Sequence, residues 1–307
     1  MDGIVVKSTG SWYEVMKPDR QIVNCRLKGK FRLEGVKHTN PITVGDKVKF
    51  ELEPNSENGV IHAIEPRKNY IIRKASNLSK QTHIIASNID QALLMVTIAF
   101  PTTSLGFIDR FLVTAEAYHI PTTIVFNKVD LCTDGLEGVL QDTIDLYHEK
   151  VGYPYIKTSV NDNIGLEEIK EFLKDKTTLV AGHSGVGKSS LLNAIEPDLN
   201  LKTGIISKSS FTGQHTTTFA QMHPLSFGGF IIDTPGIREF GVVDLNNAEL
   251  SHYFKEMKPF IGQCKFNNCQ HMNEPQCAVL KAIEEGIIPA ERYQSYLSIM
   301  ANEDVFN

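Results

Sequence analysis

The chain has 307 residues, 41% of them hydrophobic and 22% charged, and a formal net charge of −5. This length suits about two domains, with three small ones possible, and the composition is that of a globular protein with apolar cores. The modest negative charge excludes a polycation that binds nucleic acid over its whole surface, so any basic surface must be local. No stretch resembles a signal peptide or is apolar enough to span a membrane, so we expect a cytoplasmic protein without a membrane partner.

Residues 1–68 are predicted to form a small barrel of short strands. Turn-forming sequences such as Lys17-Pro18-Asp19-Arg20 separate apolar runs that are each only a few residues long. The expected strands are 3–7, 12–16, 22–27, 47–52 and 60–64. So many short strands in so short a segment favour an all-β barrel of the OB type, which we expect to be a separate domain.

A basic pattern runs through this barrel at Arg26-Leu27-Lys28-Gly29-Lys30-Phe31-Arg32-Leu33. Because strand side chains alternate between two faces, the cations lie on one face and the apolar residues on the other. Further basic residues that extend the pattern are Lys47, Lys49, Arg67, Lys68, Arg73 and Lys74. Two interpretations stay open: the ordinary solvated face of a half-buried sheet, or a track for RNA.

Residues 69–240 alternate short apolar runs with helical stretches. The expected strands are 92–98, 122–126, 155–158, 178–181 and 230–233, and the expected helices are 108–118, 137–149, 166–173 and 188–195. This alternation predicts a doubly wound α/β sheet, in which ligands bind at the carboxyl ends of the strands.

The first motif of this sheet is Asn127-Lys128-Val129-Asp130, directly after an expected strand. A carboxylate at Asp130 can accept hydrogen bonds from N1–H and the exocyclic amine of guanine, and adenine offers no such pair of donors. Asn127 is expected to bind N7 of the base and to tie neighbouring loops together, while the stem of Lys128 covers the ring. The next strand ends at Thr158-Ser159-Val160, which is either a second base contact through backbone N–H groups or a solvated strand end.

The second motif is the phosphate-binding loop Gly182-His183-Ser184-Gly185-Val186-Gly187-Lys188-Ser189-Ser190, between an expected strand and an expected helix. Its glycines let backbone N–H groups face a polyphosphate at the positive end of the helix. Lys188 is expected to bridge the β- and γ-phosphates and Ser189 to ligate Mg²⁺. The loop alone does not separate GTP from ATP, whereas Asp130 favours guanine.

Two switch segments follow. Residues 202–218 are rich in Ser, Thr and Gly, and we expect Gly213-Gln214-His215-Thr216-Thr217-Thr218 to close over the nucleotide, with the hydroxyl of Thr216 or Thr217 on Mg²⁺. In Asp233-Thr234-Pro235-Gly236, Asp233 is expected to hold Mg²⁺ through water and the Gly236 amide to sense the γ-phosphate. Ile237 stands where many GTPases have a glutamine that orients the attacking water. His215 or a partner must then supply that group.

A metal site is predicted near the C-terminus. Cys264, Cys269, His271 and Cys277 form a Cys₃His set, which is typical of a structural tetrahedral Zn²⁺. We expect it to staple a small helical domain at 241–307, with apolar helix faces at 250–257 and 293–300. The other two cysteines, Cys25 and Cys132, are expected to be small buried apolar residues, and the odd total argues against disulfides.

The order of the motifs is unusual, because the base-recognition motif precedes the phosphate loop. With that order, the loop, the Gly213–Thr218 stretch, Asp233–Ile237 and the Cys₃His spacing resemble the RsgA family of circularly permuted GTPases over essentially the whole chain. The resemblance implies an OB domain, a permuted P-loop GTPase domain and a zinc domain. It further implies a monomeric late assembly factor of the small (30S) ribosomal subunit. Such a factor binds 16S rRNA in its GTP state and hydrolyses GTP to GDP when the subunit stimulates it.

Two other functions stay open from the residues alone. An RNA-binding module with a structural or vestigial nucleotide site is compatible with Ile237, although Lys188, Ser189 and Asp233 are all present. An ATPase of the same fold is compatible with the phosphate loop, although Asp130 argues against it.

Overall fold

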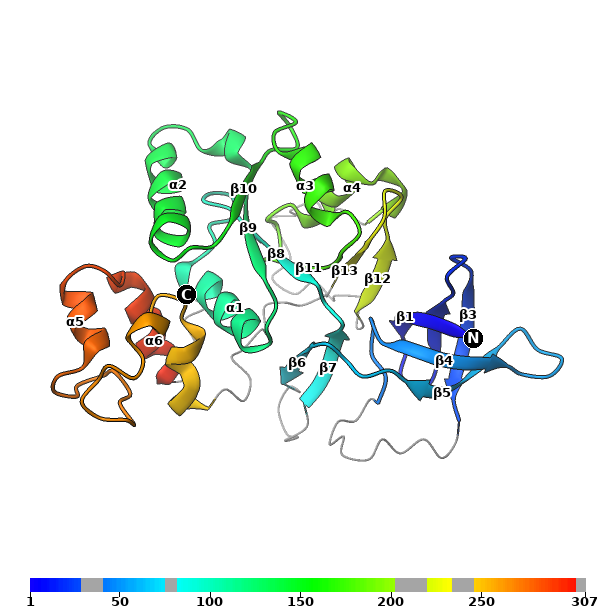
Figure 1. Ribbon diagram of the computed structural model, residues 1–307. Helices are drawn as coiled ribbons and strands as arrows, with labels where there is room; N and C mark the ends of the chain where they lie inside the picture. The colour runs from blue at the N-terminus through cyan, green and yellow to red at the C-terminus, as the bar shows by residue number, and fades with distance from the viewer. Residues whose placement is uncertain (29–40, 75–81, 202–219, 234–245, 302–307) are drawn as a thin grey trace, which may run out of the picture.

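The computed structural model describes residues 1–28, 41–74, 82–201, 220–233 and 246–301. Figure 1 shows a β-barrel at the N-terminus and a helical region at the C-terminus on opposite sides of a central α/β sheet. Within the described ranges, no helix is long and apolar enough to cross a membrane. The expected order of barrel, α/β sheet and helical region is therefore confirmed.

The barrel consists of five strands, as predicted, and closes because β1 pairs with both β2 and β4 while β3 pairs with β5. The strands are β1 (Asp2–Ser8), β2 (Tyr13–Met16), β3 (Ile22–Leu27), β4 (Lys47–Leu52) and β5 (Gly59–Ile64). Alternate apolar side chains, among them Val15, Phe50 and Ile61, fill the interior. Cys25 lies in this core with no exposed surface, and burial raises the pKa of its thiol to about 11, so it is the buried apolar residue expected.

The central sheet has the order β10-β9-β8-β11-β13-β12, with β12 antiparallel and the others parallel. Its strands are β8 (Gln91–Val96), β9 (Thr122–Asn127), β10 (Tyr155–Thr158), β11 (Thr177–Ala181), β12 (Gln221–Pro224) and β13 (Phe230–Asp233). Its helices are α1 (Leu105–Ala117), α2 (Leu136–Ile144), α3 (Leu166–Leu173) and α4 (Lys188–Ile195). Helices α1 and α2 pack on one face, and α3 and α4 on the other. The carboxyl ends of the parallel strands therefore meet at one edge.

The sheet continues into the barrel through a pairing that the sequence did not predict. Edge strand β12 pairs with β1 at Gln221 and Lys7, which joins the two parts into one eleven-stranded sheet. A hairpin of β6 (Tyr70–Lys74) and β7 (Thr82–Ser87), also unpredicted, lies beneath the junction. The apolar core under the sheet takes in Val6, Met16 and Val44 from the barrel side. The barrel and the sheet thus share a core.

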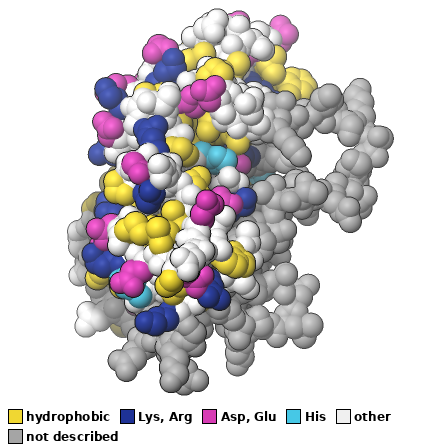
Figure 2. Space-filling model, turned by 90° about the vertical axis from the view of Figure 1, so that its right-hand side faces the viewer, with side chains coloured by type: hydrophobic (Ala, Val, Ile, Leu, Met, Phe, Trp, Pro, Cys, Tyr) yellow, Lys and Arg dark blue, Asp and Glu magenta, His cyan; other side chains and the backbone are white. Residues whose placement is uncertain are grey.

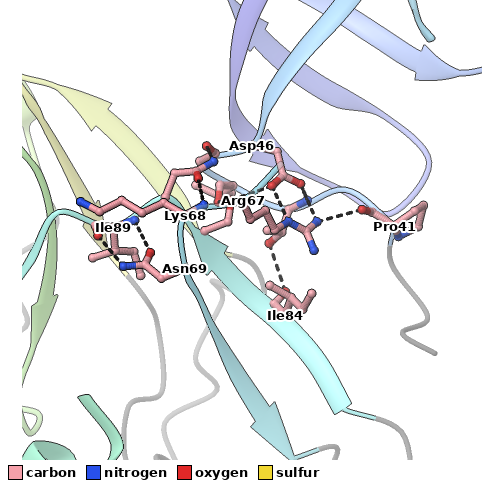
Figure 3. Close-up of polar contacts among 12 residues, drawn as sticks. Pro41, Asp46, Arg67, Lys68, Asn69, Ile84 and Ile89 are labelled. Carbon is pink, nitrogen blue, oxygen red and sulfur yellow. Dashed lines mark hydrogen bonds and ion pairs between the residues drawn. The ribbon is translucent and has the colours of Figure 1, made fainter. Parts of the chain in front are cut away.

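A buried ion pair fixes this junction (Figure 3). The carboxylate of Asp46, which has no exposed surface, accepts hydrogen bonds from Arg67 Nε and Nη2, each at 2.7 Å, from Ser87 Oγ at 2.7 Å and from the backbone N–H of Thr43 at 2.8 Å. Arg67 Nη2 also donates to the carbonyl of Pro41 at 2.9 Å. Arg67 was counted among the residues that extend the basic pattern, but its guanidinium is bonded to Asp46 and Pro41 and does not belong to an exposed basic face.

The linker residues after Arg67 are also held by polar contacts (Figure 3). The side-chain amide of Asn69 donates to the carbonyl of Ile89 and accepts from its N–H, both at 2.8 Å. Lys68 Nζ lies 3.2 Å from the carboxylate of Asp90. Lys68 and Asn69 therefore attach this part of the linker to the start of the central sheet.

The C-terminal region contains α5 (Ala278–Glu284), α6 (Ala290–Met300) and a 3₁₀ helix at Asn247–Tyr253. Buried Leu250, Phe254 and Met257 pack with α5, α6 and Val113 of α1. The expected helical face at 250–257 is apolar and buried as predicted, but its backbone is a 3₁₀ helix that ends at Tyr253. Pro289 caps α6 at its N-terminus.

Candidate nucleotide site and cysteine-histidine cluster

The predicted nucleotide-binding motifs meet at the carboxyl edge of the central sheet. Register places Thr158 of β10 beside Asn127 of β9, and Val180 of β11 beside Asp233 of β13. The phosphate loop follows β11 directly and leads into α4. Residues from four strands thus converge although the chain supplies them in an order unlike that of ordinary small GTPases.

Two glycines of the phosphate loop are required by close approach of other residues. Gly182 and Gly187 have φ values of 148° and 95°. A Cβ on Gly182 would lie 2.5 Å from the carbonyl oxygen of Met95, and one on Gly187 would lie 2.5 Å from Nδ2 of Asn127. Any side chain here would push the loop away from its neighbours. The glycine spacing of the motif therefore reflects packing as well as access for phosphate.

The Lys188 ammonium bends back over the phosphate loop. Its Nζ donates to the carbonyls of Gly182 at 2.7 Å and His183 at 2.9 Å. A polyphosphate entering the loop would offer charged oxygens to the same protons, and charge-assisted bonds of this kind are the stronger ones. Ser189 is half-buried in the first turn of α4, next to Lys188. The structure thus brings together the two residues predicted to hold phosphate and metal.

Asn127 ties three loops together, as its side chain was expected to do. Its Nδ2 donates to the carbonyl of Val186 in the phosphate loop at 2.7 Å, and its Oδ1 accepts from the hydroxyl of Thr158 at 2.8 Å. The side chain is buried. A contact between Asn127 and N7 of a base stays a prediction.

Lys128 is held by a loop that sequence reasoning missed. The residue has a left-handed backbone (φ 59°), and its Nζ donates to the carbonyls of Phe100 at 2.6 Å and Gly185 at 2.7 Å. Burial lowers the pKa of Lys128, with the charge of Asp130 opposing that shift. Phe100 belongs to the turn between β8 and α1, and no motif marks it. The ammonium is thus anchored to two loops, and the contact of the aliphatic stem of Lys128 with a base stays a prediction.

Asp130 is kept ionised, which the proposed guanine contact requires. Burial acts to raise the pKa of Asp130, but hydrogen bonds from Ser159 and Asn161 and the charge of Lys128 outweigh it, so the pKa is lowered. Asn161 Nδ2 donates to Asp130 Oδ2 at 2.9 Å, another contact that no motif predicted.

The backbone N–H of Ser159, for which a base contact and a solvated strand end were both open, is bonded within the protein. It donates to the carbonyl of Ile164 at 3.1 Å, and the reverse bond closes the pair at 2.9 Å. That N–H group therefore does not face a base. Ser159 supports the site through its hydroxyl, which helps to hold Asp130.

Of the switch residues, the structure describes only Asp233, which lies half-buried at the end of β13. The other predicted switch residues lie outside the described ranges: His215, Thr216, Thr217, Gly236 and Ile237. Asp233 pairs with Gln221 of β12, which in turn pairs with Lys7 of the barrel. The predicted magnesium-binding carboxylate is thus two strands away from the barrel.

Cys264, Cys269, His271 and Cys277 form a compact cluster that could hold a metal ion. Their ligand atoms all lie within 4.8 Å of one another, and His271 Nδ1 is 3.3 Å from Cys277 Sγ and 3.6 Å from Cys264 Sγ. Burial lowers the pKa of His271, which favours the neutral imidazole that a metal requires. Burial raises the pKa of Cys269 to about 12, so a bound cation is needed to hold it as a thiolate. The donor set fits a soft, tetrahedral ion.

Lys47 and Lys49 project from the barrel as the period of two predicted, with Val48 and Phe50 buried between them. Carboxylates neutralise part of this face: Lys49 Nζ is 2.9 Å from Asp2, and Arg26 pairs with Glu53. Figure 2 shows acidic and basic side chains interspersed on the described part of this side. Residues 29–40, 73 and 74, which carry the rest of the expected basic pattern, are not described in side-chain detail.

Two protein-family models together match nearly all of the barrel and of the central α/β sheet. The RsgA N-terminal domain family matches residues 2–61, and the RsgA GTPase family matches residues 64–243. Relatives cover almost the full chain. A Flavobacterium johnsoniae protein named small ribosomal subunit biogenesis GTPase RsgA is 53% identical over 308 residues, which is 99% of this chain and 94% of that protein. A Phocaeicola vulgatus protein of the same name is 50% identical over 304 residues, or 99% and 97% of the two chains.

Two solved structures share the fold. YjeQ from Thermotoga maritima superposes with a TM-score of 0.78 and 38% identity, covering 98% of this chain and 97% of that one. YloQ, described as a circularly permuted GTPase, gives a TM-score of 0.74 and 31% identity, covering 98% and 94%. Both likenesses extend through the C-terminal cluster.

Proposed function

This chain belongs to the RsgA family of circularly permuted GTPases, and we propose that it hydrolyses GTP to GDP and phosphate during maturation of the small (30S) ribosomal subunit. The relatives carry that role in their names. The structure supports the nucleotide part independently, through one contact. Asn127 of the base-recognition motif is bonded to Val186 of the phosphate loop, so the two motifs form one site.

In the proposed site the residues of the base-recognition motif and of the phosphate loop keep the roles predicted from their motifs. The carboxylate of Asp130 accepts from guanine, and the Lys128 stem and Asn127 border the base, beside Val129 of the same motif. Lys188 leaves the loop carbonyls to bridge the β- and γ-phosphates. Backbone N–H groups of the loop from Gly182 to Ser190 cradle the phosphates.

Magnesium would be held by Ser189, by a threonine of the pair Thr216 and Thr217, and through water by Asp233. When bound, Mg²⁺ would neutralise the negative charge that develops on the phosphates during phosphoryl transfer to water. The Gly236 amide senses the γ-phosphate. His215, or a group from the ribosomal partner, orients the attacking water because Ile237 has no hydrogen-bonding side chain.

We assign the Cys₃His cluster to one structural Zn²⁺, held by Cys264, Cys269, His271 and Cys277. The chain divides into a barrel at 1–68, a GTPase domain at 69–240 and a zinc domain at 241–307. The barrel, with Lys28, Lys30 and Arg32, supplies the 16S rRNA contact. Because the proposed substrate particle is the ribosomal subunit, we expect the protein to act in the cytoplasm, as a monomer.

Turnover of GTP measured with and without small subunits tests the proposal. We expect slow hydrolysis alone and strong acceleration by subunits, since a group supplied by a partner is worth roughly 10³–10⁵ in rate. Lys188→Ala should abolish both rates. Hydrolysis that neither responds to subunits nor depends on Lys188 would instead favour an RNA-binding module with a vestigial nucleotide site. Competition by ATP equal to that by GTP would favour an ATPase.

A further inference from the structure

A single arginine links the cysteine-histidine region to the helix that borders the nucleotide site. Arg292 of α6 has no exposed surface. Its Nη1 donates to Asp109 Oδ1 of α1 at 2.6 Å, and its Nε donates to Glu256 Oε1 at 2.6 Å. Burial acts against the charge, but the two carboxylates outweigh it and raise the pKa of Arg292. The guanidinium is thus a permanent charge that joins three segments of the chain.

The residue two positions before Asp109 contacts the phosphate loop. The ring of Phe107 packs against the imidazole of His183 in a tilted arrangement, with centroids 3.7 Å apart and planes at 32°. Because a helix rises about 1.5 Å per residue, the Arg292 contact and the His183 contact are separated by only about 3 Å along α1. A shift of α1 at Asp109 therefore moves the ring against which the loop rests.

The same helix is preceded by the turn that anchors Lys128. Ser104 caps α1 by accepting from the N–H of Phe107, and Phe100, four residues earlier, accepts from Lys128 Nζ. Thr103 Oγ1 accepts from the N–H of Thr97, which holds this turn against the end of β8. The start of α1 thus reaches both the phosphate loop and the base-recognition motif.

On its other side, Arg292 is adjacent to a residue that contacts the cluster. Tyr293 donates its hydroxyl to the carbonyl of His271 at 2.8 Å. Tyr147 donates to Asp109 at 2.7 Å and completes the buried group. Asp109 Oδ2 has no hydrogen-bond partner among the residues that the structure describes, so Arg292 is the main compensation for this charge.

We infer that Arg292 is a positioning residue for the nucleotide site: through Asp109 and α1 it sets where Phe107 holds the phosphate loop. This inference rests on the proposed GTPase function. Nucleotide affinity then depends on the packing of Arg292, which belongs to the cysteine-histidine region and does not itself contact the phosphate loop. By linkage, nucleotide binding must in turn stabilise that packing.

The test compares three single variants and one double variant of the full chain by their affinity for fluorescent GDP. Arg292→Lys keeps the charge but loses the fork that serves two carboxylates. Phe107→Leu removes the ring packing against His183 without touching the C-terminal region. We expect each to weaken GDP binding about fivefold or more. The double variant should lose less than the product of the two, because both act on one path. Lys258→Ala breaks the exposed Lys258–Glu116 pair, 2.8 Å long, at the same interface and should leave affinity unchanged.

The outcomes separate a positioning role from a merely structural one. A lower melting temperature with unchanged GDP affinity for Arg292→Lys, or fully multiplicative losses in the double variant, would overturn the inference. If Arg292→Lys loses its near-ultraviolet circular dichroism, Glu256→Gln replaces it, with the same expectation. If the natural chain binds no GDP, the proposed function fails, and hydrogen exchange at residues 182–190 in the nucleotide-free variants still decides. Faster exchange in Arg292→Lys than in Lys258→Ala supports the link, and equal exchange refutes it.

Discussion

Asn127 Nδ2 donates to the carbonyl of Val186 at 2.7 Å across 59 residues of chain. In this permuted order the base-recognition motif precedes the phosphate loop in the chain, and this hydrogen bond joins the two motifs in the fold. We expect Asn127→Ala to weaken GDP binding and to lower the free energy of unfolding by about 1–3 kcal/mol, because buried partners lose their hydrogen bonds. Calorimetric titration and urea denaturation measure the two effects. Asn247→Ala, which removes an exposed amide bonded to Met300, is the control and should change neither.

Asp130 should determine which base is bound. Asp130→Asn replaces an acceptor by a donor, which suits the carbonyl at position 2 of xanthine and not the amine of guanine. We expect kcat/KM for GTP to fall by roughly 10⁴-fold and hydrolysis of XTP to appear. The exposed neighbour Asp134, changed to Asn, should leave the base preference as it was. Retained GTP preference in Asp130→Asn would rule out its contact with the base.

The Asp46–Arg67 pair should be a stability determinant. Arg67→Met leaves a carboxylate buried without its main partner, a change that costs about 3–5 kcal/mol. Arg26→Ala, which breaks an exposed pair with Glu53, should cost no more than about 1 kcal/mol. Chemical denaturation distinguishes the two. Equal and small losses would mean that the junction contributes little to folding.

Lys28→Glu together with Lys30→Glu should weaken binding to small subunits and leave the intrinsic GTPase rate unchanged. Phosphate contacts release counterions, so the natural protein should bind less tightly as salt rises, and the variant should show a shallower slope. Lys281→Glu, an exposed charge reversal on α5, is the control for a charge change away from the barrel. Equal subunit affinities of variant and natural protein across the salt titration would remove the barrel from the RNA contact.

If the cysteine-histidine cluster holds the proposed Zn²⁺, removing that ion should destabilise the C-terminal region before the central sheet. Cys277→Ser removes one ligand, and a strong chelator removes the ion itself. The small core around Phe254 and Tyr296 then lacks the metal cross-link that stabilises it. We expect loss of bound zinc by elemental analysis and faster hydrogen exchange at residues 264–300. Cys132→Ser, outside the cluster, should retain the metal. A zinc-free Cys277→Ser protein with unchanged exchange would mean that the cluster does not support this fold.

The elements that the sequence predicted well are those with a strong local signal. Buried parallel strands are continuous apolar runs, and α3, α4 and the phosphate loop carry both periodicity and turn chemistry. Strand β12 was missed because Gln221-Met222-His223-Pro224 is short, polar and ends in proline, as edge strands often are. It is held as a strand by four antiparallel residue pairs with β13 and by one pair with β1, which lies more than 200 residues earlier in the chain.

Contacts between residues far apart in the chain could not be predicted from the sequence either. Arg67 was counted with the basic surface because no sequence pattern indicates that it forms a buried ion pair with Asp46. Phe100 and Asn161, which hold Lys128 and Asp130, contribute through backbone geometry or a loop position that no motif specifies. The spacing of the Cys₃His set, by contrast, was sufficient to bring its members together.

The pairing of β1 with β12 also has a consequence for how the protein can be divided. Without the barrel, β12 would present an unpaired edge, and such edges invite aggregation with other chains. The apolar surface under Val6, Met16 and Val44 would be exposed at the same time. A fragment that starts at residue 69 should therefore be less soluble than the whole chain, because the barrel covers both the edge of β12 and this apolar surface.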